Sequence, residues 1–338
     1  MNLQIVNSLD ENIWRDYVAL NPQGNIFHTP EIYQVFSHTK GHHPLLQAVV
    51  NKHKEILALL TPVQITLADG LFRPLTTRAI VYGSVLCSST GYDANALDLL
   101  LSSYVRAAKR QALFTELRNL ADLSLLQGVF AQNGFIYTEH LDYLIDLDIT
   151  PEQVLQNIGP RTRKHIRQGI RKGSMRIDLL TQHSQLEDWF RLVSKTYREA
   201  RIPLADRSLF EAAYNILMPK GMVQFWLGRV DSNLVAASAE LLYKDVIYGW
   251  YSGVDRAYAD ESPGELLMWH VLNWGCTHGY KIYDFGGAGK PGEAYGVRDF
   301  KAKFGGKLVE HGRNILIHSK ALLRVSEKGY QLYRYLIG

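Results

Sequence analysis

Residues 223–253 read VQFWLGRVDSNLVAASAELLYKDVIYGWYSG and hold three consecutive runs rich in β-branched and aromatic residues. The runs are 223–230, 234–243 and 246–253, and the turn residues 231–233 join the first two. Short apolar runs joined by polar turns are typical of antiparallel strands. The stretch therefore predicts three adjacent antiparallel strands in the second half of the chain.

The first half of the chain repeats this pattern. Three strand-like runs occur at 46–50, 56–65 and 79–86. The elements before the three runs also match, as do the elements after them. In the first half these elements are a strand at 3–6, a helix with Trp14, a helix opening at Thr29-Pro30, a long helix at 94–111 and a strand at 114–118. In the second half they are a strand at 175–180, a helix with Trp189, a helix opening at Ser208, a long helix at 264–278 and a strand at 282–285.

Each half then continues through a short helix to a closing pair of strands. The repeated order is that of the GNAT acyltransferase fold, in which a mixed sheet splits near its middle and the acyl donor lies in the split. We therefore expect an α/β (α+β) chain of two tandem GNAT-like domains, each a mixed, mostly antiparallel sheet flanked by helices. The expected boundaries are 1–148 and 149–316, with 317–338 forming a helix that packs back on the first domain.

Composition excludes several classes of protein. No apolar run is long enough to span a membrane and the N-terminus lacks the features of a signal peptide, so we expect a cytoplasmic protein. The two cysteines, Cys87 and Cys276, fit neither a disulfide framework nor a zinc site, and the twelve histidines show no metal-binding spacing. We expect no metal. The net charge of +4 does not by itself indicate a nucleic-acid partner.

The segment 159–173, GPRTRKHIRQGIRKG, is strongly basic. On a helix, Arg163, Arg167 and Arg171 fall on one stripe, and Ile166 and Ile170 fall on another that we expect to pack on the domain. Converging guanidinium groups bind phosphate, as in tRNA, a nucleotide-sugar diphosphate or a lipid headgroup. The alternative is a solvated basic helix.

Glycines cluster after the strand 282–285, in YDFGGAGKPG at 283–292. They indicate close approach of backbone to a ligand or a strand, or ordinary turns. The segment is not a P-loop, because Pro291 follows Lys290. Neither half carries the Arg/Gln-x-x-Gly-x-Gly/Ala loop with which GNAT enzymes hold the pyrophosphate of coenzyme A, and in the second half the matching loop is DRAYADESPG at 255–264. This sequence disfavours an acyl-CoA donor.

The tandem repeat, the basic junction, YDFGG at 283–287 and DFKAKFG at 299–305 together resemble the FemABX family. That family moves an amino acid from aminoacyl-tRNA to the peptide of a peptidoglycan precursor. The resemblance implies that Lys301, after Phe300, stabilises the oxyanion of the transfer, and that Arg207 holds the diphosphate of the precursor. Too few residues separate Arg207 from Val223 for the coiled-coil arm of some members, so the chain resembles the compact type.

The predicted site combines the residues from the motifs with those from the resemblance. The catalytic residues are expected to be Lys301, Phe300 and Asp284, and the substrate-binding residues are expected to be Arg163, Arg167, Arg171, Arg207, Tyr248, Gly286 and Gly287.

These expectations lead to a cytoplasmic monomer that needs no bound cofactor and uses charged tRNA as co-substrate. The acceptor is expected to be an amine of a peptidoglycan or other cell-envelope precursor, reached by peripheral contact where the precursor is lipid-linked. The alternative is an acyl-CoA-dependent N-acyltransferase that acts on a sugar or amine in envelope polysaccharide synthesis. A third reading is a phosphoglycan-binding module without catalysis.

Overall fold

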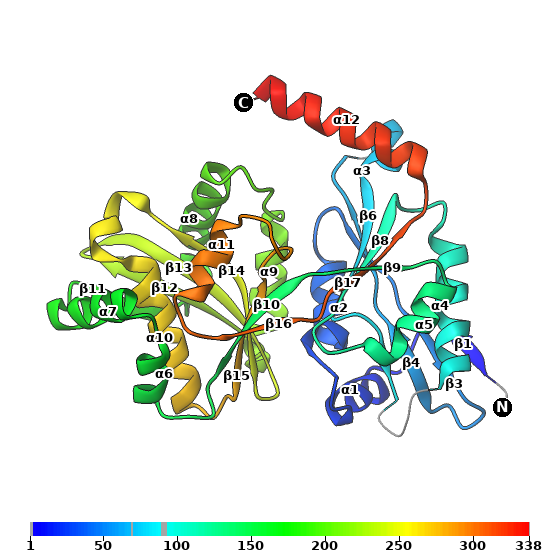
Figure 1. Cartoon of the computed structure of the whole chain (residues 1–338), viewed down its shortest axis with the longest axis horizontal. Helices are drawn as coiled ribbons and strands as arrows, with labels where there is room; N and C mark the ends of the chain where they lie inside the picture. Colours follow the sequence, from blue (N-terminus) through cyan, green and yellow to red (C-terminus); the bar gives the residue numbers. More distant parts are fainter. Residues whose placement is uncertain (1–2, 69, 89–92, 338) are drawn as a thin grey trace. The chain divides into compact units, whose positions relative to one another are not determined.

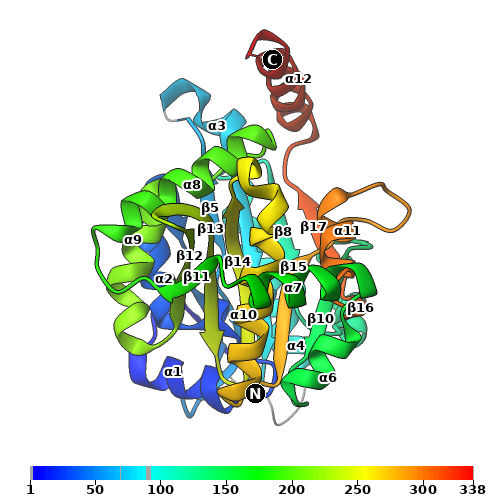
Figure 2. The ribbon, with the colours of Figure 1, turned by 90° about the vertical axis from the view of Figure 1, so that its left-hand side faces the viewer.

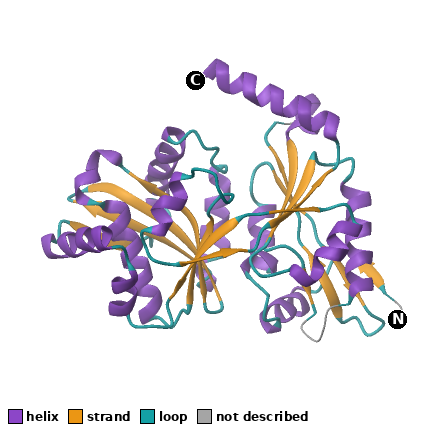
Figure 3. Ribbon diagram, in the orientation of Figure 1, coloured by secondary structure: helices purple, strands orange, loops and turns teal. Residues whose placement is uncertain are grey.

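The computed structural model describes residues 3–68, 70–88 and 93–337. The chain divides into two compact units (Figure 1). The first unit comprises Met1–Glu139 with His311–Gly338, and the second unit is His140–Glu310. Both units combine helices with strands (Figure 3), so the predicted α/β fold class is confirmed.

The strands of the first unit form two sheets. One has the order β1-β3-β4-β7 and the other has the order β2-β5-β6-β8-β17-β9. Their bounds are β1 Gln4–Val6, β2 His42–Pro44, β3 Gln47–Val50, β4 Ile56–Leu60, β5 Val63–Thr66, β6 Thr77–Tyr82, β7 Leu86–Cys87, β8 Phe114–Arg118, β9 Ile136–Thr138 and β17 Arg313–Ile317. All neighbouring strands are antiparallel except β6 and β8, which are parallel.

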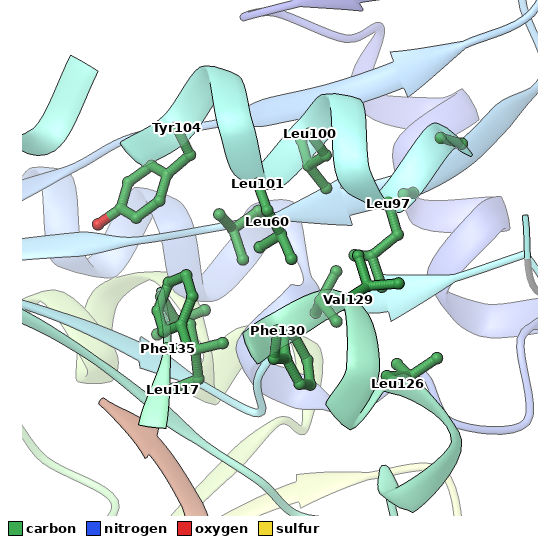
Figure 4. Close-up of a cluster of buried hydrophobic side chains, with 14 of the residues drawn as sticks. Leu60, Leu97, Leu100, Leu101, Tyr104, Leu117, Leu126, Val129, Phe130 and Phe135 are labelled. Atoms are coloured by element: carbon green, nitrogen blue, oxygen red, sulfur yellow. The ribbon is translucent and has the colours of Figure 1, made fainter. Parts of the chain in front are cut away.

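The helices of the first unit are α1 Glu11–Leu20, α2 Pro30–Ser37, α3 Arg73–Thr76, α4 Ala94–Ala108, α5 Gln127–Gln132 and α12 Lys320–Ile337. Helix α4 supplies one apolar face to the core, and leucines of α4 meet Leu60, Leu117 and Phe130 beneath it (Figure 4). Thr29 caps α2 through its hydroxyl, as the Thr-Pro start signal predicts. Helix α12 belongs to this unit, where Ser326 Oγ donates a hydrogen bond to the carbonyl of Leu75.

The second unit holds a single sheet of order β11-β12-β13-β14-β15-β10-β16. Its strands are β10 Leu141–Asp146, β11 Met175–Leu179, β12 Val223–Val230, β13 Asn233–Tyr243, β14 Val246–Val254, β15 Ile282–Gly287 and β16 Lys307–Glu310. Its helices are α6 Pro151–Asn157, α7 Pro160–Lys172, α8 Gln185–Glu199, α9 Arg207–Ile216, α10 Pro263–Thr277 and α11 Gly296–Ala302. The three predicted antiparallel strands are β12, β13 and β14.

Both faces of this sheet are covered by helices. Successive residues of a strand point to opposite faces, so Phe225 packs on Trp189 of α8 while Trp226 packs on His270 and Trp274 of α10. Helix α9 packs on α8, and α6 and α7 pack on α10 (Figure 2). Two sets of helices therefore lie on opposite sides of the sheet.

The closing strands explain why the boundaries of the two units differ from the expected domain boundaries. Strand β10 lies in the first half of the chain but pairs with β15 and β16 of the second unit. Strand β17 follows the second half but inserts between β8 and β9 of the first unit. Each half therefore supplies one strand to the sheet of the other. The expected boundaries at 148 and 316 become 139 and 310 in the structure, because sequence periodicity identifies a strand without identifying its partner.

The strand expected at 79–86 is shorter in the structure. β6 ends at Tyr82, because Gly83 and Ser84 both have positive φ angles and turn the chain before β7. No helix in the described part of the chain is long and apolar enough to cross a membrane.

Candidate active site

The sheet of the second unit opens between β14 and β15. The two strands pair in parallel only from Val246 with Ile282 to Tyr248 with Asp284. Beyond that point β14 continues to Val254 beside β13, while β15 pairs on its other edge with β10. The edge of β14 from Gly249 onward therefore faces an opening in the sheet, as expected for a GNAT-like domain.

A β-bulge in β14 begins this opening. Glu240 lies opposite Gly249 and Ala239 lies opposite Tyr251, which leaves Trp250 as the extra residue. A bulge bends its strand and increases the local twist. The bulge therefore turns β14 away from β15 directly after their last paired residues. Backbone N–H groups on such an edge can donate hydrogen bonds to a bound acyl group.

Lys301 of α11 is buried at the end of β15. Its ammonium group donates hydrogen bonds to the carbonyl oxygens of Phe285, Gly286 and Gly287, at 2.6, 2.8 and 2.9 Å. An ammonium group has three N–H donors, and these contacts occupy all of them. Burial lowers the pKa of Lys301, and the nearby carboxyl groups of Asp142 and Asp284 oppose that shift. In this geometry the lysine fixes the backbone that ends β15.

Asp142 of β10 and Asp284 of β15 lie beside Lys301, and both are buried. Burial raises the pKa of Asp142 well above its usual value, and the charge of Asp284 raises it further. A hydrogen bond joins the two carboxyl groups. Two adjacent carboxylates resist ionising together, whereas the charge of Lys301 acts in the opposite direction and lowers the pKa of Asp142. Backbone N–H groups also donate to the pair, from Tyr143 to Asp142 and from Gly286 to Asp284.

A second buried acid lies nearby in the same sheet. Glu240 of β13 is fully buried and accepts a hydrogen bond from the hydroxyl of Tyr283, at 3.1 Å. Burial raises the pKa of Glu240 to about 7. Gly249 makes this contact feasible, because a Cβ at that position would come within 2.5 Å of the Tyr283 hydroxyl oxygen.

The structure brings four of the predicted residues together. Asp284, Gly286 and Gly287 all contact the Lys301 cluster, and Tyr248 is the register partner of Asp284 on β14. Burial raises the pKa of Tyr248, and the charge of Asp284 adds to the shift. The positive φ of Gly286 lets the chain turn at the end of β15.

Phe300 lies on α11 beside Lys301 but packs as a core residue. Its ring meets Phe304 edge-on, with the ring centroids 5.2 Å apart, and the ammonium group of Lys303 lies over it. Gly264 at the start of α10 also lies against it. These contacts support a packing role, and the predicted catalytic role stays a prediction.

The predicted arginine stripe lies on α7. Arg167 and Arg171 are exposed, and Arg163 donates to the backbone carbonyl and the side chain of Gln156 on α6. The expected packing face was wrong in one position, since Ile166 is buried but Ile170 is 56% exposed. Gly169 takes its place, because a Cβ there would come within 2.7 Å of Leu266 on α10.

Arg207 is the first residue of α9, and its predicted role in holding a diphosphate stays a prediction. Its guanidinium group pairs with the carboxylates of Glu187 and Glu211. Helix α9 packs on α8, whereas α7 packs on α10, on the other face of the sheet. The stripe on α7 and Arg207 therefore lie on opposite faces of the sheet.

The loop that would hold the pyrophosphate of coenzyme A is acidic. Residues 255–262 include Asp255, which pairs with Lys195, and Glu261, which pairs with Lys172. The loop runs into α10 with Ser262 at positive φ. Residues 255–262 contain no glycine, so the loop lacks the cradle of backbone N–H groups that would hold a pyrophosphate.

Sequence reasoning missed Asp142 and Glu240. Each is an acid with an apolar or aromatic residue on both sides in its strand, and an acid that is buried needs a partner. That signal was present, but the partners lie on other strands and appear only in the fold. Among the described residues no three His, Cys, Asp or Glu side chains gather as metal ligands do.

Sequence comparison identifies one domain. The family model of the acetyltransferase (GNAT) domain matches residues 160–302, which include β14, β15, Asp284 and Lys301. No curated protein sequence matches the chain.

Solved structures show the same fold over nearly the whole chain. FemX is 15% identical with a TM-score of 0.72, covering 98% of this chain and 99% of that chain. A tandem GNAT protein from the clavulanic acid biosynthesis pathway is 13% identical with a TM-score of 0.62, covering 94% and 99%. L-PGS from Bacillus licheniformis is 12% identical with a TM-score of 0.58, covering 96% of both chains. The predicted FemABX-like tandem GNAT fold is confirmed.

Proposed function

We propose that this chain, which has the tandem GNAT fold of FemX, is an aminoacyltransferase that acts in cell-envelope synthesis. The donor is an aminoacyl-tRNA and the acceptor is an amine of a peptidoglycan or related precursor. One observation carries the proposal: β14 and β15 separate after Tyr248 and Asp284, and a buried cluster of Asp142, Asp284 and Lys301 lies at that point.

The chemistry fits such an opening. The acceptor amine attacks the ester carbonyl of the donor, and the carbonyl oxygen takes up negative charge. The bond to the ribose oxygen then breaks as the amide forms, and the proton that the amine loses passes through water to that oxygen. A neutral amine needs little activation, so the protein's main tasks are alignment and stabilisation of the oxyanion. Backbone N–H groups along the open edge of β14 are suited to the second task. Lys301 supports the site by holding the backbone of residues 285–287.

The loop at residues 255–262 favours a donor other than coenzyme A. It lacks the glycines with which the Arg/Gln-x-x-Gly-x-Gly/Ala loop of GNAT enzymes holds the pyrophosphate of coenzyme A. The tandem arrangement shared with FemX and with L-PGS supports transfer of an aminoacyl group. The second candidate is an N-acyltransferase that uses an acyl thioester, and the match of residues 160–302 to the acetyltransferase domain favours it.

One experiment separates these functions. The protein is incubated with a mixture of charged tRNAs, and separately with acetyl-CoA, in the presence of a panel of lipid II-type and nucleotide-linked acceptors. Products are identified by mass. We expect addition of an amino acid only in the tRNA reaction. Acetylation in the other reaction would favour the thioester enzyme, and acceptor binding without any product would favour the non-catalytic module.

A further inference from the structure

Large apolar side chains are exposed beside helix α3 of the first unit. Leu71 is 95% exposed, Phe72 is 65% exposed and Leu67 is 63% exposed. They lie in the segment that leads from β5 into α3. Single exposed leucines are common on protein surfaces, but a cluster that includes a phenylalanine marks a contact surface.

Helix α12 extends this apolar surface. It packs on α3 through the face that carries Leu323 and Ser326, which are half-buried. Leu322 and Val325 lie on the neighbouring stripe of the helix and remain exposed. Exposed apolar side chains are therefore present on both segments that meet at the contact between α3 and α12.

The same two segments are rich in cations. Lys320, Arg324 and Lys328 recur every fourth residue, so they form one exposed stripe along α12. Arg73 at the start of α3 is also exposed. Against these four cations, residues 67–76 and 317–329 contain two acids, Asp69 and Glu327.

We propose that this α3–α12 surface, formed by Leu67, Leu71, Phe72 and Arg73 with the exposed residues of α12, docks on an anionic membrane. Apolar side chains enter the boundary between headgroups and acyl chains, while lysines and arginines pair with the headgroups. A second copy of the chain is a poorer occupant, because a two-fold contact would bring the same cation stripes together. The inference goes beyond the proposed function and holds whichever group the enzyme transfers.

The test is sedimentation of the full chain with vesicles. One set contains equal parts of phosphatidylglycerol and phosphatidylcholine, and the other contains phosphatidylcholine alone. We expect binding to the anionic set that weakens as salt is added, because the Debye length shortens. The variant Leu71→Ser/Phe72→Ser should bind at least about 10-fold more weakly. The variant Lys320→Gln/Arg324→Gln/Lys328→Gln should lose most of the preference for anionic vesicles.

Leu125→Ser provides the matched control, because Leu125 is 87% exposed elsewhere in the first unit. It should bind as the wild type does, and all variants should show the melting temperature of the wild type. Equal binding by the Leu71→Ser/Phe72→Ser variant would overturn the proposal. The proposal would also be overturned if neither protein bound vesicles while the wild type formed a dimer that the Leu71→Ser/Phe72→Ser variant did not form.

Discussion

The two units end their central parallel strand pair in different ways. In the first unit β6 and β8 stay paired up to Tyr82 and Arg118, and β6 itself ends there. In the second unit the pairing of β14 with β15 ends at Tyr248 and Asp284, but β14 continues to Val254. The first sheet is closed at this point and the second is open.

The polar groups at the ends of these two strand pairs also differ. In the first unit Glu116 of β8 pairs with Arg118 and Arg313, which are partly exposed. In the second unit Asp142, Asp284 and Lys301 are buried. Charges act more strongly where water is excluded, so a fixed cluster beside an opening suits catalysis while a solvated ion pair suits stability. The comparison teaches that two units with a repeated order of elements can differ at the point where their parallel strand pair ends.

Replacing Lys301 tests the comparison most directly. Lys301→Met should lower turnover by about two orders of magnitude or more, the scale of losing one group that supports an oxyanion. It should also lower the free energy of unfolding by about 3 kcal/mol, because it leaves buried carboxyl groups without their cation. Steady-state kinetics and denaturant unfolding measure the two effects. Lys303→Met at the C-cap of α11 is the control, since Lys303 is exposed.

Hydrogen exchange then separates two roles for Lys301. If the lysine acts by holding the backbone, amide exchange of residues 285–288 should rise in the variant. A loss of turnover with unchanged exchange would mean that Lys301 acts on the substrate itself. Turnover near that of the wild type would remove the buried cluster from the mechanism.

Glu240 provides a second test, based on pH. Its folded-state pKa of about 7 exceeds the ordinary 4.5, so the folded chain holds a proton that the unfolded chain has lost. Stability from this group is therefore complete below about pH 4.5 and falls as the pH rises to about 7. The loss should be about 3 kcal/mol, and Glu240→Gln should remove it. Unfolding curves across this pH range measure the difference, with the exposed Glu152→Gln as control. If the free energy of unfolding of Glu240→Gln fell with pH as it does in the wild type, another group would cause the loss.

The arginine stripe of α7 provides a third test. Arg167→Ala/Arg171→Ala should weaken binding of charged tRNA or acceptor by about 10-fold and reduce the salt dependence of log K by about 1.5, the effect of two lost phosphate contacts. The melting temperature should be unchanged, because both side chains are exposed. The control Arg191→Ala/Arg198→Ala removes two exposed charges from α8. The same loss in both variants would indicate a general charge effect and no specific contact.

The sequence predicted the strands and helix starts that depend on local patterns. Alternating apolar residues and turns located β12, β13 and β14, and the Thr29-Pro30 signal located α2. The repeat predicted two GNAT-like units. The exchange of β10 and β17 between the units was not predictable in this way, because the pattern of a strand does not identify the strands it pairs with.

Only the site residues that lie in local sequence motifs were predictable. The glycine-rich segment and the Phe-Lys motif led to Asp284, Gly286, Gly287 and Lys301, which the fold brings together. Asp142 was missed, because its partners are about 140 and 160 residues away in sequence and only strand pairing joins them. The saturated hydrogen bonds of Lys301 likewise depend on the backbone path after β15.

The smallest expected effect comes from the first unit. Glu116→Gln removes the carboxylate that Arg118 and Arg313 share, at 2.6 and 2.8 Å. The two guanidinium groups are partly exposed and regain water, so the free energy of unfolding should fall by only about 1 kcal/mol. Turnover should change by less than about twofold, because Glu116 lies in the closed sheet and a solvated ion pair does little for a reaction elsewhere. The corresponding variant in the open sheet, Asp284→Asn, should lose far more activity. Comparable losses in Glu116→Gln would show that the closed sheet also takes part in the reaction, and the assignment of chemistry to the second unit would then fail.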